Sequence, residues 1–177
     1  DEILLASRLD AREADVGTVE LVDLIGLAAE ECARVDAELD VTAVPEGLEV
    51  RGVAKLLRRA LRNLLENARR YSQGDITVVL QRHDGQAQLS VLDRGPGVPP
   101  ALRERIFEPF YRLPGASERA GGVGLGLALV RSIAQRHNGS VRCEDQPDGS
   151  GGACFVLRLP LHSPPGTAAP APQRKGT

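Results

Sequence analysis

Four polar side chains recur at helical spacing in the middle of the chain. Asn63, Glu66, Asn67 and Arg70 stand at i, i+3, i+4 and i+7, so a helix would carry them on one stripe. Asparagine is unfavourable inside helices, and two on one stripe need an explanation. An asparagine carbonyl can bind Mg²⁺ together with nucleotide phosphates and water, and an arginine one turn further can contact a terminal phosphate. The stripe indicates either such a site or a polar helix edge that hydrogen-bonds neighbouring loops; this segment alone favours neither.

A second polar feature follows an apolar run that is typical of a strand. Asp93, Gly95 and Gly97 form a D-x-G-x-G turn, in which glycine permits a positive φ and close approach of the backbone to a ligand. A carboxylate held at such a turn can accept a hydrogen bond from an exocyclic amine, such as that of adenine. An Asp-Gly-rich turn after a strand is usually no more than a turn, so this motif alone is weak.

A glycine-rich segment leads into another predicted helix. Free N–H groups at such a helix start bind anions readily. The segment lacks the Lys-Ser/Thr pair of a P-loop, and no βαβ strand leads straight into it as in dinucleotide-binding folds. A flexible connector is the alternative interpretation. The segment consists of Gly122, Val123, Gly124, Leu125 and Gly126.

Aromatic residues lie in the long irregular stretch between the two glycine motifs. Phe107 and Phe110 are two of the three phenylalanines in the chain, and they suggest a loop docked on the body of the domain. We expect residues 113–121 to act as a lid over the site. A small hydrophobic cluster that only pins the loop is the alternative.

The four polar residues need a helix to position them, and the sequence predicts one over residues 53–71. Apolar residues recur at about 100° per residue on one stripe, which would face the core. A further stripe of arginines, Arg58, Arg62 and Arg69, would face solvent. The apolar stripe consists of Val53, Leu57, Ala60, Leu61, Leu64 and Ala68.

Helices and strands alternate around this helix. Asp23 is suited to N-cap a helix that runs to about residue 37, and Asp84-Gly85 predicts a tight hairpin turn. Because several strands form hairpins, we expect a two-layer α/β sandwich with a mixed, mostly antiparallel sheet and helices packed on one face. The remaining pattern predicts strands at 18–21, 39–44, 48–51, 76–81, 87–92, 140–144 and 153–159, a short helix at 100–105 and a helix at 124–137.

Composition narrows the class of protein. The 177 residues suit one domain with tails, and a net charge of −2 gives no reason to expect nucleic acid as a partner. Three cysteines without CxxC or Cys/His spacing indicate reduced thiols. No apolar run reaches the roughly 18 residues of a membrane span. Residues 162–177 are rich in Pro, Ala, Gly and Thr, so we expect a disordered tail.

Taken in order, these motifs resemble the catalytic ATP-binding domain of sensor histidine kinases, whose Bergerat fold is shared with type II topoisomerase ATPases. Residues 63–72 resemble the N box of that family, and Asp93–Gly97 its G1 box. Phe107–Phe110 resembles the F box and Gly122–Gly126 the G2 box. The resemblance covers about residues 16–161. Four motifs in the right order are far more specific than any one of them.

The resemblance implies ATP and Mg²⁺ as ligands, and it assigns the phosphate end of the site. Asn67 would coordinate Mg²⁺, with Asn63 supporting it, and Arg70 would contact phosphate. Arg112 and the loop Gly122–Gly126 would handle phosphates beneath the lid.

The resemblance also assigns the end of the site that holds the base. Tyr71 would pack on adenine, and the Asp93 carboxylate would accept a hydrogen bond from the adenine amino group. Gly95 and Gly97 would line that pocket, and residues 151–152 fall near the place of a weaker third glycine motif.

Residues 1–14 resemble the end of a helix of the dimerisation and phosphotransfer domain of these kinases, ahead of an ATP-binding domain at 15–161. The phosphoacceptor motif of that domain is absent: His83 lies at the predicted hairpin, His137 ends a helix and His162 begins the tail. The resemblance implies that the acceptor lies upstream in the dimerisation domain and that this fragment does not autophosphorylate alone. It further implies a full-length homodimer, a cognate response regulator and a cytoplasmic position in a membrane-anchored sensor, whereas the fragment itself would be monomeric.

Asn63 stands where ATPase relatives carry a glutamate that acts as general base toward water. An amide cannot take up that proton, so the position favours phosphoryl transfer over hydrolysis. Glu66 is the nearest carboxylate, and we expect a minor positioning or base role for it. Two alternatives remain. The helix remnant and the full F box argue against an anti-sigma-factor-type serine kinase, while Asn67, Asp93 and the glycine loops argue against a non-catalytic nucleotide-binding module.

Overall fold

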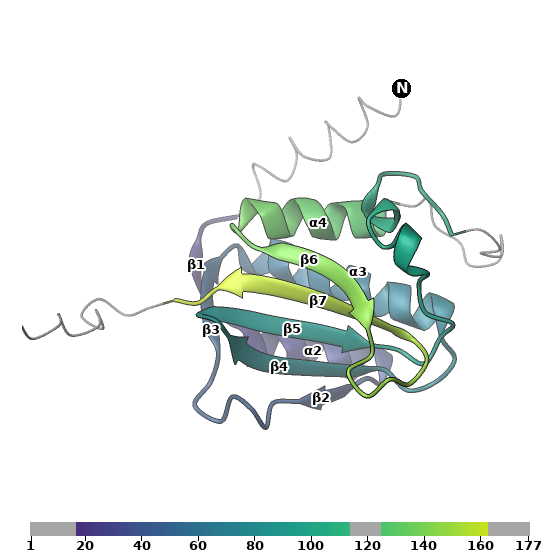
Figure 1. Ribbon diagram of the computed structural model, residues 1–177. Coiled ribbons are helices and arrows are strands. Elements are labelled where there is room, and N and C mark those ends of the chain that lie inside the picture. The colour runs from purple at the N-terminus through teal and green to yellow at the C-terminus, as the bar shows by residue number, and fades with distance from the viewer. Residues whose placement is uncertain (1–16, 114–124, 163–177) are drawn as a thin grey trace, which may run out of the picture.

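The computed structural model describes residues 17–113 and 125–162, which form a two-layer α/β sandwich (Figure 1). The five strands of the main sheet are β2 (Glu38–Asp40), β4 (Thr77–His83), β5 (Gln86–Leu92), β6 (Ser140–Asp145) and β7 (Ala153–Pro160). They lie in the order β2-β4-β5-β7-β6. Only the pairing of β2 with β4 is parallel, so the sheet is mixed and mostly antiparallel as expected.

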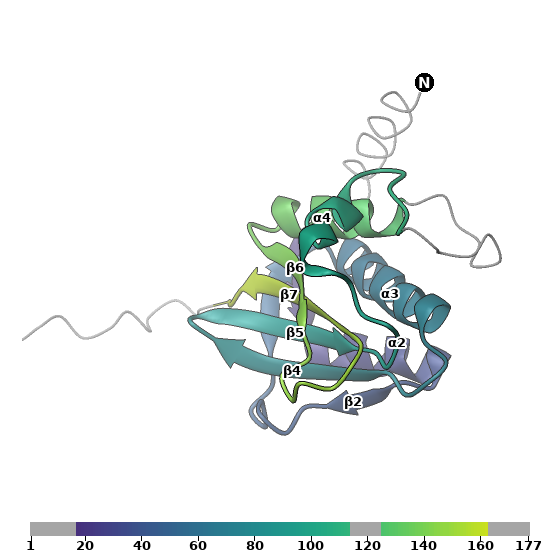
Figure 2. The same ribbon diagram turned by 45° about the vertical axis from the view of Figure 1, so that its right-hand side comes forward.

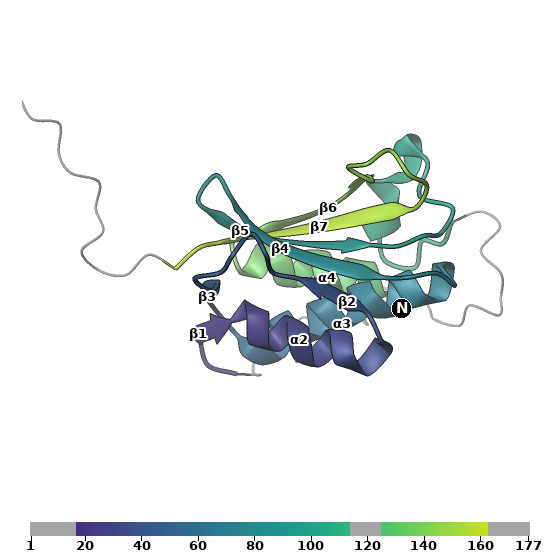
Figure 3. The ribbon, with the colours of Figure 1, turned by 90° about the horizontal axis from the view of Figure 1, so that it is seen from below.

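Helices cover one face of this sheet (Figure 3). They are α2 (Leu24–Val35), α3 (Ala54–Tyr71) and α4 (Gly126–Arg136). Two strands outside the main sheet, β1 (Glu20–Asp23) and β3 (Glu49–Gly52), form an antiparallel pair. Figure 2 shows α3 and α4 side by side, and the two helices that frame the predicted site pack directly on each other. The expected fold class is therefore confirmed.

The core-facing side of α3 follows the predicted apolar stripe closely. Leu57, Ala60, Leu61, Leu64 and Ala68 are all buried. Two further leucines of the helix are buried as well, and Val53 is the half-buried residue just before it. Burial of this stripe fixes the rotation of α3, which is what sends its asparagines toward the sheet edge beside α4.

The arginines of α3 do not simply face solvent, as their stripe had predicted. Glu31 on α2 is only 2% exposed and lies between two of them. Arg62 donates from Nε and Nη2 to the two carboxylate oxygens at 3.0 and 2.9 Å, and Arg58 donates to Oε1 at 3.3 Å. Arg69 donates to the carbonyls of Val35 and Gly74. This stripe therefore fastens α2 to α3.

Several shorter elements differ from the prediction for local reasons. The strand expected over 39–44 ends at Asp40, because its carboxylate accepts hydrogen bonds from the N–H and hydroxyl of Thr42 at 3.0 and 2.7 Å and turns the chain. The first strand starts and ends two residues later than expected. The short helix at 100–105 is instead two 3₁₀ turns, Pro100–Leu102 and Arg105–Phe107.

Other local predictions are confirmed. Asp23 caps α2 by accepting a hydrogen bond from the N–H of Ile25 at 3.0 Å. Asp84 and Gly85 both have positive φ, 49° and 74°, as a type I′ hairpin turn requires. His162, expected to be the first residue of the disordered tail, instead donates its N–H to the Glu49 carbonyl. The expected helix remnant at 1–14 and the tail from 163 onward lie outside the described residues.

The three cysteines are free and buried. Burial raises the pKa of Cys32 to about 11, of Cys143 to about 12 and of Cys154 to about 11. These thiols therefore stay protonated and are poor nucleophiles near neutral pH. Among the helices of the described ranges, none is both long and apolar enough to cross a bilayer.

The pairing of Glu31 with the arginines of α3 gives a stability prediction. The hydrogen bond from Arg62, opposed by burial and aided by Arg58, lowers the pKa of Glu31 below its ordinary value of 4.5. At about pH 7, Glu31→Gln should lower the free energy of unfolding by about 1–2 kcal/mol, since both arginines are more than one-third exposed and solvent screens part of the attraction. Urea unfolding of both proteins measures the difference.

The same substitution predicts a pH dependence with a definite sign. A depressed carboxyl pKa stabilises the fold above the unfolded value, and that stabilisation disappears as pH falls through the lower folded value. The difference between the two proteins should therefore shrink below pH 4.5. Glu30→Gln is the matched control, because Glu30 pairs with Arg58 while 65% exposed and should contribute less than about 0.5 kcal/mol. Equal losses in both variants would contradict the role of Glu31.

Candidate nucleotide-binding site

The end of α3 and the turn after β5 are held against each other. Ser72, the residue that follows α3, accepts hydrogen bonds on its hydroxyl from the N–H groups of Arg94 and Gly74 at 3.1 and 3.2 Å. Gly95 passes so close to the helix end that a Cβ there would lie 2.5 Å from the Tyr71 carbonyl oxygen. The N-box and G1-box residues predicted from sequence therefore meet at one place, and glycine at 95 is a steric requirement.

Asp93 is the most constrained polar residue of this junction. It is 3% exposed, and its Oδ1 accepts hydrogen bonds from the N–H groups of Gly95 at 2.9 Å and Ala153 at 3.0 Å. Its own N–H donates to the Ala153 carbonyl at 3.1 Å, which extends the pairing of β5 and β7 by one residue. No residue of the described ranges donates to Oδ2. One carboxylate oxygen is thus held by two backbone N–H groups, whereas the second has no such partner within residues 17–113 and 125–162.

The loop between β6 and β7 closes one side of the same turn. Gly152 has a φ of 113°, and a Cβ there would lie 2.1 Å from the Asp93 carbonyl oxygen. Gly97, with a φ of 76°, faces the carbonyl of Gly152 from the other side. Gly151 has open space around it. Close approach of the backbone thus requires glycine at 152 but not at 151, and the place of these residues in a third nucleotide motif stays a prediction.

The polar stripe of α3 lies along the edge that faces α4. Asn63 donates its amide to the carbonyl of Gly126, the first residue of α4, at 3.3 Å. Asn67 is half-buried, and Arg70, one turn closer to the Asp93 junction, is exposed. The stripe thus runs along α3 from the start of α4 toward the G1 turn, and the ligand roles of Asn67 and Arg70 stay predictions. Leu125 immediately precedes α4.

Glu66 lies on the same helix, one position before Asn67. It is exposed, and its charge adds to the hydrogen bond and charge of Glu31 in raising the pKa of Arg62. Arg62 is itself hydrogen-bonded to Glu31. Glu66 is thus near enough to Arg62 for its charge to act on it, and its role at the site stays a prediction.

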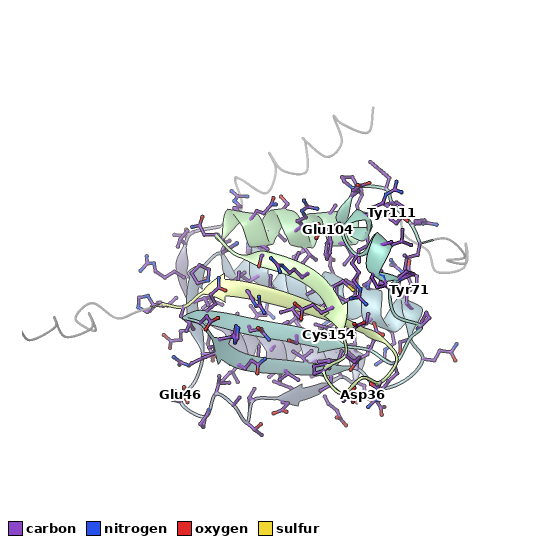
Figure 4. All side chains as sticks on the ribbon, in the orientation of Figure 1. Asp36, Glu46, Tyr71, Glu104, Tyr111 and Cys154 are labelled. Carbon is purple, nitrogen blue, oxygen red and sulfur yellow. The ribbon has the colours of Figure 1, made fainter. Side chains whose placement is uncertain are left out.

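The aromatic loop is docked on the sheet, as the F-box pattern indicated. Phe107 is buried and meets Phe155 of β7 edge to face, with ring centroids 6.2 Å apart. The guanidinium of Arg105 lies 4.9 Å from the ring centre of Tyr111. Figure 4 shows Tyr111 and Tyr71 at the same end of the molecule, where α3 ends. Residues 114–121 of the expected lid and the residues Gly122, Val123 and Gly124 lie outside the described residues.

Phe110 adopts a left-handed backbone conformation, with a φ of 66°. The N–H of Tyr111 donates to the Glu108 carbonyl at 3.2 Å, so residues 108–111 form a tight turn with Pro109 and Phe110 at its centre. Glycine or asparagine usually fills such a position, and sequence patterns gave no sign of this conformation. Arg112, which follows the turn, is exposed.

His137 has a structural role. Its Nδ1 faces the Ile133 carbonyl at 2.7 Å and therefore carries the proton, while Nε2 accepts the N–H of Val53 at 3.1 Å. The predicted helix stop after it is confirmed, because Asn138 has a φ of 58° and Gly139 donates its N–H to the Ala134 carbonyl at 2.8 Å. His137 thus joins the end of α4 to the start of α3.

The donor set of the described residues restricts how a metal ion could be held. Nowhere in these ranges do three His, Cys, Asp or Glu side chains gather in a group that could hold a metal ion. An ion at the N-box stripe could take a side-chain oxygen from Asn63, Glu66 or Asn67 and complete its shell from phosphates and water. That combination suits Mg²⁺, which commonly binds few protein groups together with nucleotide phosphates.

Comparisons with known proteins agree with this arrangement. Residues 52–163 match the family of histidine kinase-, DNA gyrase B- and HSP90-like ATPases. The chain is 35% identical over 173 residues to the sensor-like histidine kinase SenX3 of Mycolicibacterium smegmatis, a match that covers 93% of this chain and 44% of SenX3. The chain thus spans less than half the length of this curated relative.

Two solved structures show the same fold. The mycobacterial sensor histidine kinase MprB superposes with a TM-score of 0.70 and 33% identity, covering 82% of this chain and 99% of that one. Full-length ShkA in complex with AMPPNP gives a TM-score of 0.66 and 26% identity, over 84% of this chain and 32% of ShkA. The ordered motifs, the junction at Asp93 and these matches lead to one conclusion: the chain belongs to the ATP-binding family of histidine kinase-, DNA gyrase B- and HSP90-like ATPases.

Proposed function

We propose that this chain is the ATP-binding catalytic domain of a sensor histidine kinase. The observation that carries the proposal is the junction of α3 with the turn after β5. There a locked carboxylate with one available oxygen, Asp93, lies beside the helix that bears Asn67 and Arg70. Groups suited to a base amine and to metal-bound phosphates thus lie next to each other. The resemblance to SenX3 and MprB, both named as sensor histidine kinases, supports the assignment.

Asp93 binds the adenine base in this proposal. Its Oδ2 accepts a hydrogen bond from the exocyclic amine, while Oδ1 stays with the N–H groups of Gly95 and Ala153. Gly95 and Gly97 keep the turn free of side chains, so a flat ring can approach the backbone. Tyr71 packs against the base from the end of α3. The complex of ShkA with AMPPNP, an ATP analogue, supports ATP as the ligand.

The phosphates lie along the exposed stripe of α3. The Asn67 side-chain carbonyl is the protein ligand for Mg²⁺, which neutralises the phosphates, and Arg70 contacts them as a charged donor. Asn63 keeps α4 in place through its bond to Gly126 and so supports the glycine loop that precedes that helix. Arg112 and the segment Gly122–Gly126 complete the phosphate contacts.

The proposed reaction is transfer of the γ-phosphate of ATP to a histidine of a dimerisation and phosphotransfer domain. A neutral imidazole nitrogen attacks phosphorus in line, the bond to the bridging oxygen breaks and ADP departs. The chain's residues need only orient the phosphates and neutralise their charge. Asn63 cannot accept a proton from water, which favours transfer over hydrolysis. Glu66, the nearest carboxylate on this helix, has a minor positioning or base role.

The proposal extends to the whole protein. The acceptor domain belongs to the same kinase, and a cognate response regulator receives the phosphoryl group from its histidine. The full-length protein is a homodimer anchored in a membrane with this domain in the cytoplasm, and the isolated domain is a monomer that does not autophosphorylate.

The chain should bind a fluorescent ATP analogue in the presence of Mg²⁺ and phosphorylate an added histidine-bearing dimerisation domain. Fluorescence titration measures the binding, and radiolabelled ATP measures the transfer. The product should lose its label in acid, because a phosphoramidate hydrolyses there and a serine phosphate ester survives. Acid-stable label would identify a serine kinase, binding without transfer would indicate a nucleotide-binding module, and absence of binding would exclude all three functions.

Asp93→Asn should weaken ATP binding by roughly 1–3 kcal/mol, because the new NH₂ group faces the adenine amine and leaves a donor unpaired. The amide oxygen still accepts from Gly95 and Ala153, so the fold should remain intact. Isothermal titration of both proteins with Mg-ATP measures the loss. Asp148→Asn, an exposed change in the β6–β7 loop, is the control. Unchanged affinity in Asp93→Asn would remove Asp93 from the adenine pocket.

Asn67→Ala should remove most of the dependence of ATP binding on Mg²⁺, since the side-chain oxygen that binds the ion is lost. The measurement is ATP affinity with Mg²⁺ and with a chelator present. Asn67→Asp retains an oxygen ligand and should restore the dependence on Mg²⁺. A wild-type response to Mg²⁺ in Asn67→Ala would show that another group holds the ion.

A further inference from the structure

Gln146 immediately follows β6 and belongs to none of the nucleotide motifs. Its side chain is 7% exposed and points into the junction beneath Asp93. Nε2 lies 2.6 Å from the Asp93 carbonyl oxygen and 3.2 Å from the Ala153 carbonyl oxygen. Because both neighbours are acceptors, the amide must turn its nitrogen toward them, and the two N–H bonds of that nitrogen serve the two oxygens.

These two bonds complete the fixation of Asp93. Its N–H is paired with the Ala153 carbonyl, and its Oδ1 with the N–H groups of Gly95 and Ala153. Gln146 supplies the partner for the remaining backbone group, the carbonyl. With the backbone held on both sides and one carboxylate oxygen locked, the direction of the free Oδ2 is determined. A small rotation of the Asp93 peptide would turn that oxygen away from a bound base.

The residues around Gln146 leave its side chain little room for another orientation. A Cβ on Gly152 would lie 2.1 Å from the Asp93 carbonyl oxygen and 3.2 Å from Nε2 of Gln146, so the loop passes directly over this contact. The preceding residue, Asp145, accepts a hydrogen bond from Arg103, which also donates to the Val98 carbonyl at 3.1 Å. The end of β6 thus holds the turn after β5 at two points, on either side of Gly97.

We propose that Gln146 is a positioning residue that aims the Asp93 carboxylate and thereby sets the preference of this site for a purine with a 6-amino group. The inference rests on the proposed adenine-binding role of Asp93. Gln146 touches no ligand and acts through the Asp93 carbonyl. Its loss should therefore weaken the part of the affinity that depends on the amine and leave the part that depends on phosphates and Mg²⁺.

The test compares two nucleotides in the whole chain. Mg-ATP and magnesium purine riboside triphosphate, which lacks the 6-amine, are titrated calorimetrically into the unaltered chain, Gln146→Met and Asp93→Asn. We expect Gln146→Met to bind ATP about five- to tenfold more weakly and the purine nucleotide within about twofold of the unaltered chain. Because both residues act on one hydrogen bond, adding Gln146→Met to Asp93→Asn should cause no further loss beyond about twofold.

Gln88→Met is a matched control, because Gln88 is also buried, at 9% exposure, and hydrogen-bonded, accepting from Arg158 at 3.0 Å. It lies in β5, the strand that leads to Asp93, and should leave the ratio of the two affinities unchanged. Urea unfolding checks that each variant folds. Should Gln146→Met fail to fold, Gln146→Asn keeps an amide one methylene too short to reach, and the same selective loss is expected.

Outcomes for the inference and for the proposed function are distinct. Equal losses for both nucleotides, or undiminished ATP affinity, in a folded Gln146 variant would overturn the positioning role while Asp93 keeps its own. Equal affinity of the unaltered chain for the two nucleotides would instead remove the adenine contact of Asp93. Absence of ATP binding by the unaltered chain would overturn the proposed function, and the inference with it.

Discussion

Two backbone N–H groups, those of Gly95 and Ala153, hold one oxygen of a buried carboxylate where β5 leaves the sheet. This contact joins three separate parts of the chain: the turn after β5, the start of β7 and, through Ser72, the end of α3. The remaining features of the site follow from it. Glycine is required at 95 and 152 because the backbone segments that meet at Asp93 approach too closely for a Cβ.

The helices extend this arrangement along the sheet. The buried stripe of α3 fixes its rotation, and the bond from Asn63 to Gly126 and the bond from Val53 to His137 attach α4 near both of its ends. On the opposite side, Glu31 holds α2 against α3. The polar stripe is thus supported by a helix that is fastened on two sides, which is the preorganisation that a reaction based on positioning requires.

Motifs and periodicity predicted much of this structure, since both are local. The apolar stripe of α3, the cap at Asp23 and the turn at Asp84-Gly85 depend on residues a few positions apart, and all three were predicted correctly. Spacing gives the phase of a stripe but not the neighbour that covers it. Arg58 and Arg62 were therefore expected in solvent, although they face Glu31, which lies about thirty residues earlier in the sequence.

Long-range contacts of loop residues were not predicted either, because sequence spacing does not reveal which distant residue a side chain meets. Gln146 lies 53 positions from Asp93, in a turn-rich segment with no pattern of its own. Phe110 adopts a left-handed backbone conformation that its residue type does not predict. The strand β2 is shorter than predicted because the side chain of Asp40 turns the chain. Asp93 itself was predicted as a site residue because it begins a D-x-G-x-G motif. The sequence thus revealed the residues proposed to meet the nucleotide more readily than those that hold them in place.

The strands β1 and β3 lie at the opposite end of the sandwich from Tyr71 (Figures 1 and 4). The 18 residues of α3 connect these ends and span about 27 Å at the usual rise per residue. Because α3 is one uninterrupted helix, the orientations of its two ends are coupled. By geometry alone, a rotation of roughly 10° about one end would displace the other by about 5 Å, close to one turn of a helix. A small change of orientation at the β1–β3 end of the helix therefore corresponds to a large displacement at the Tyr71 end.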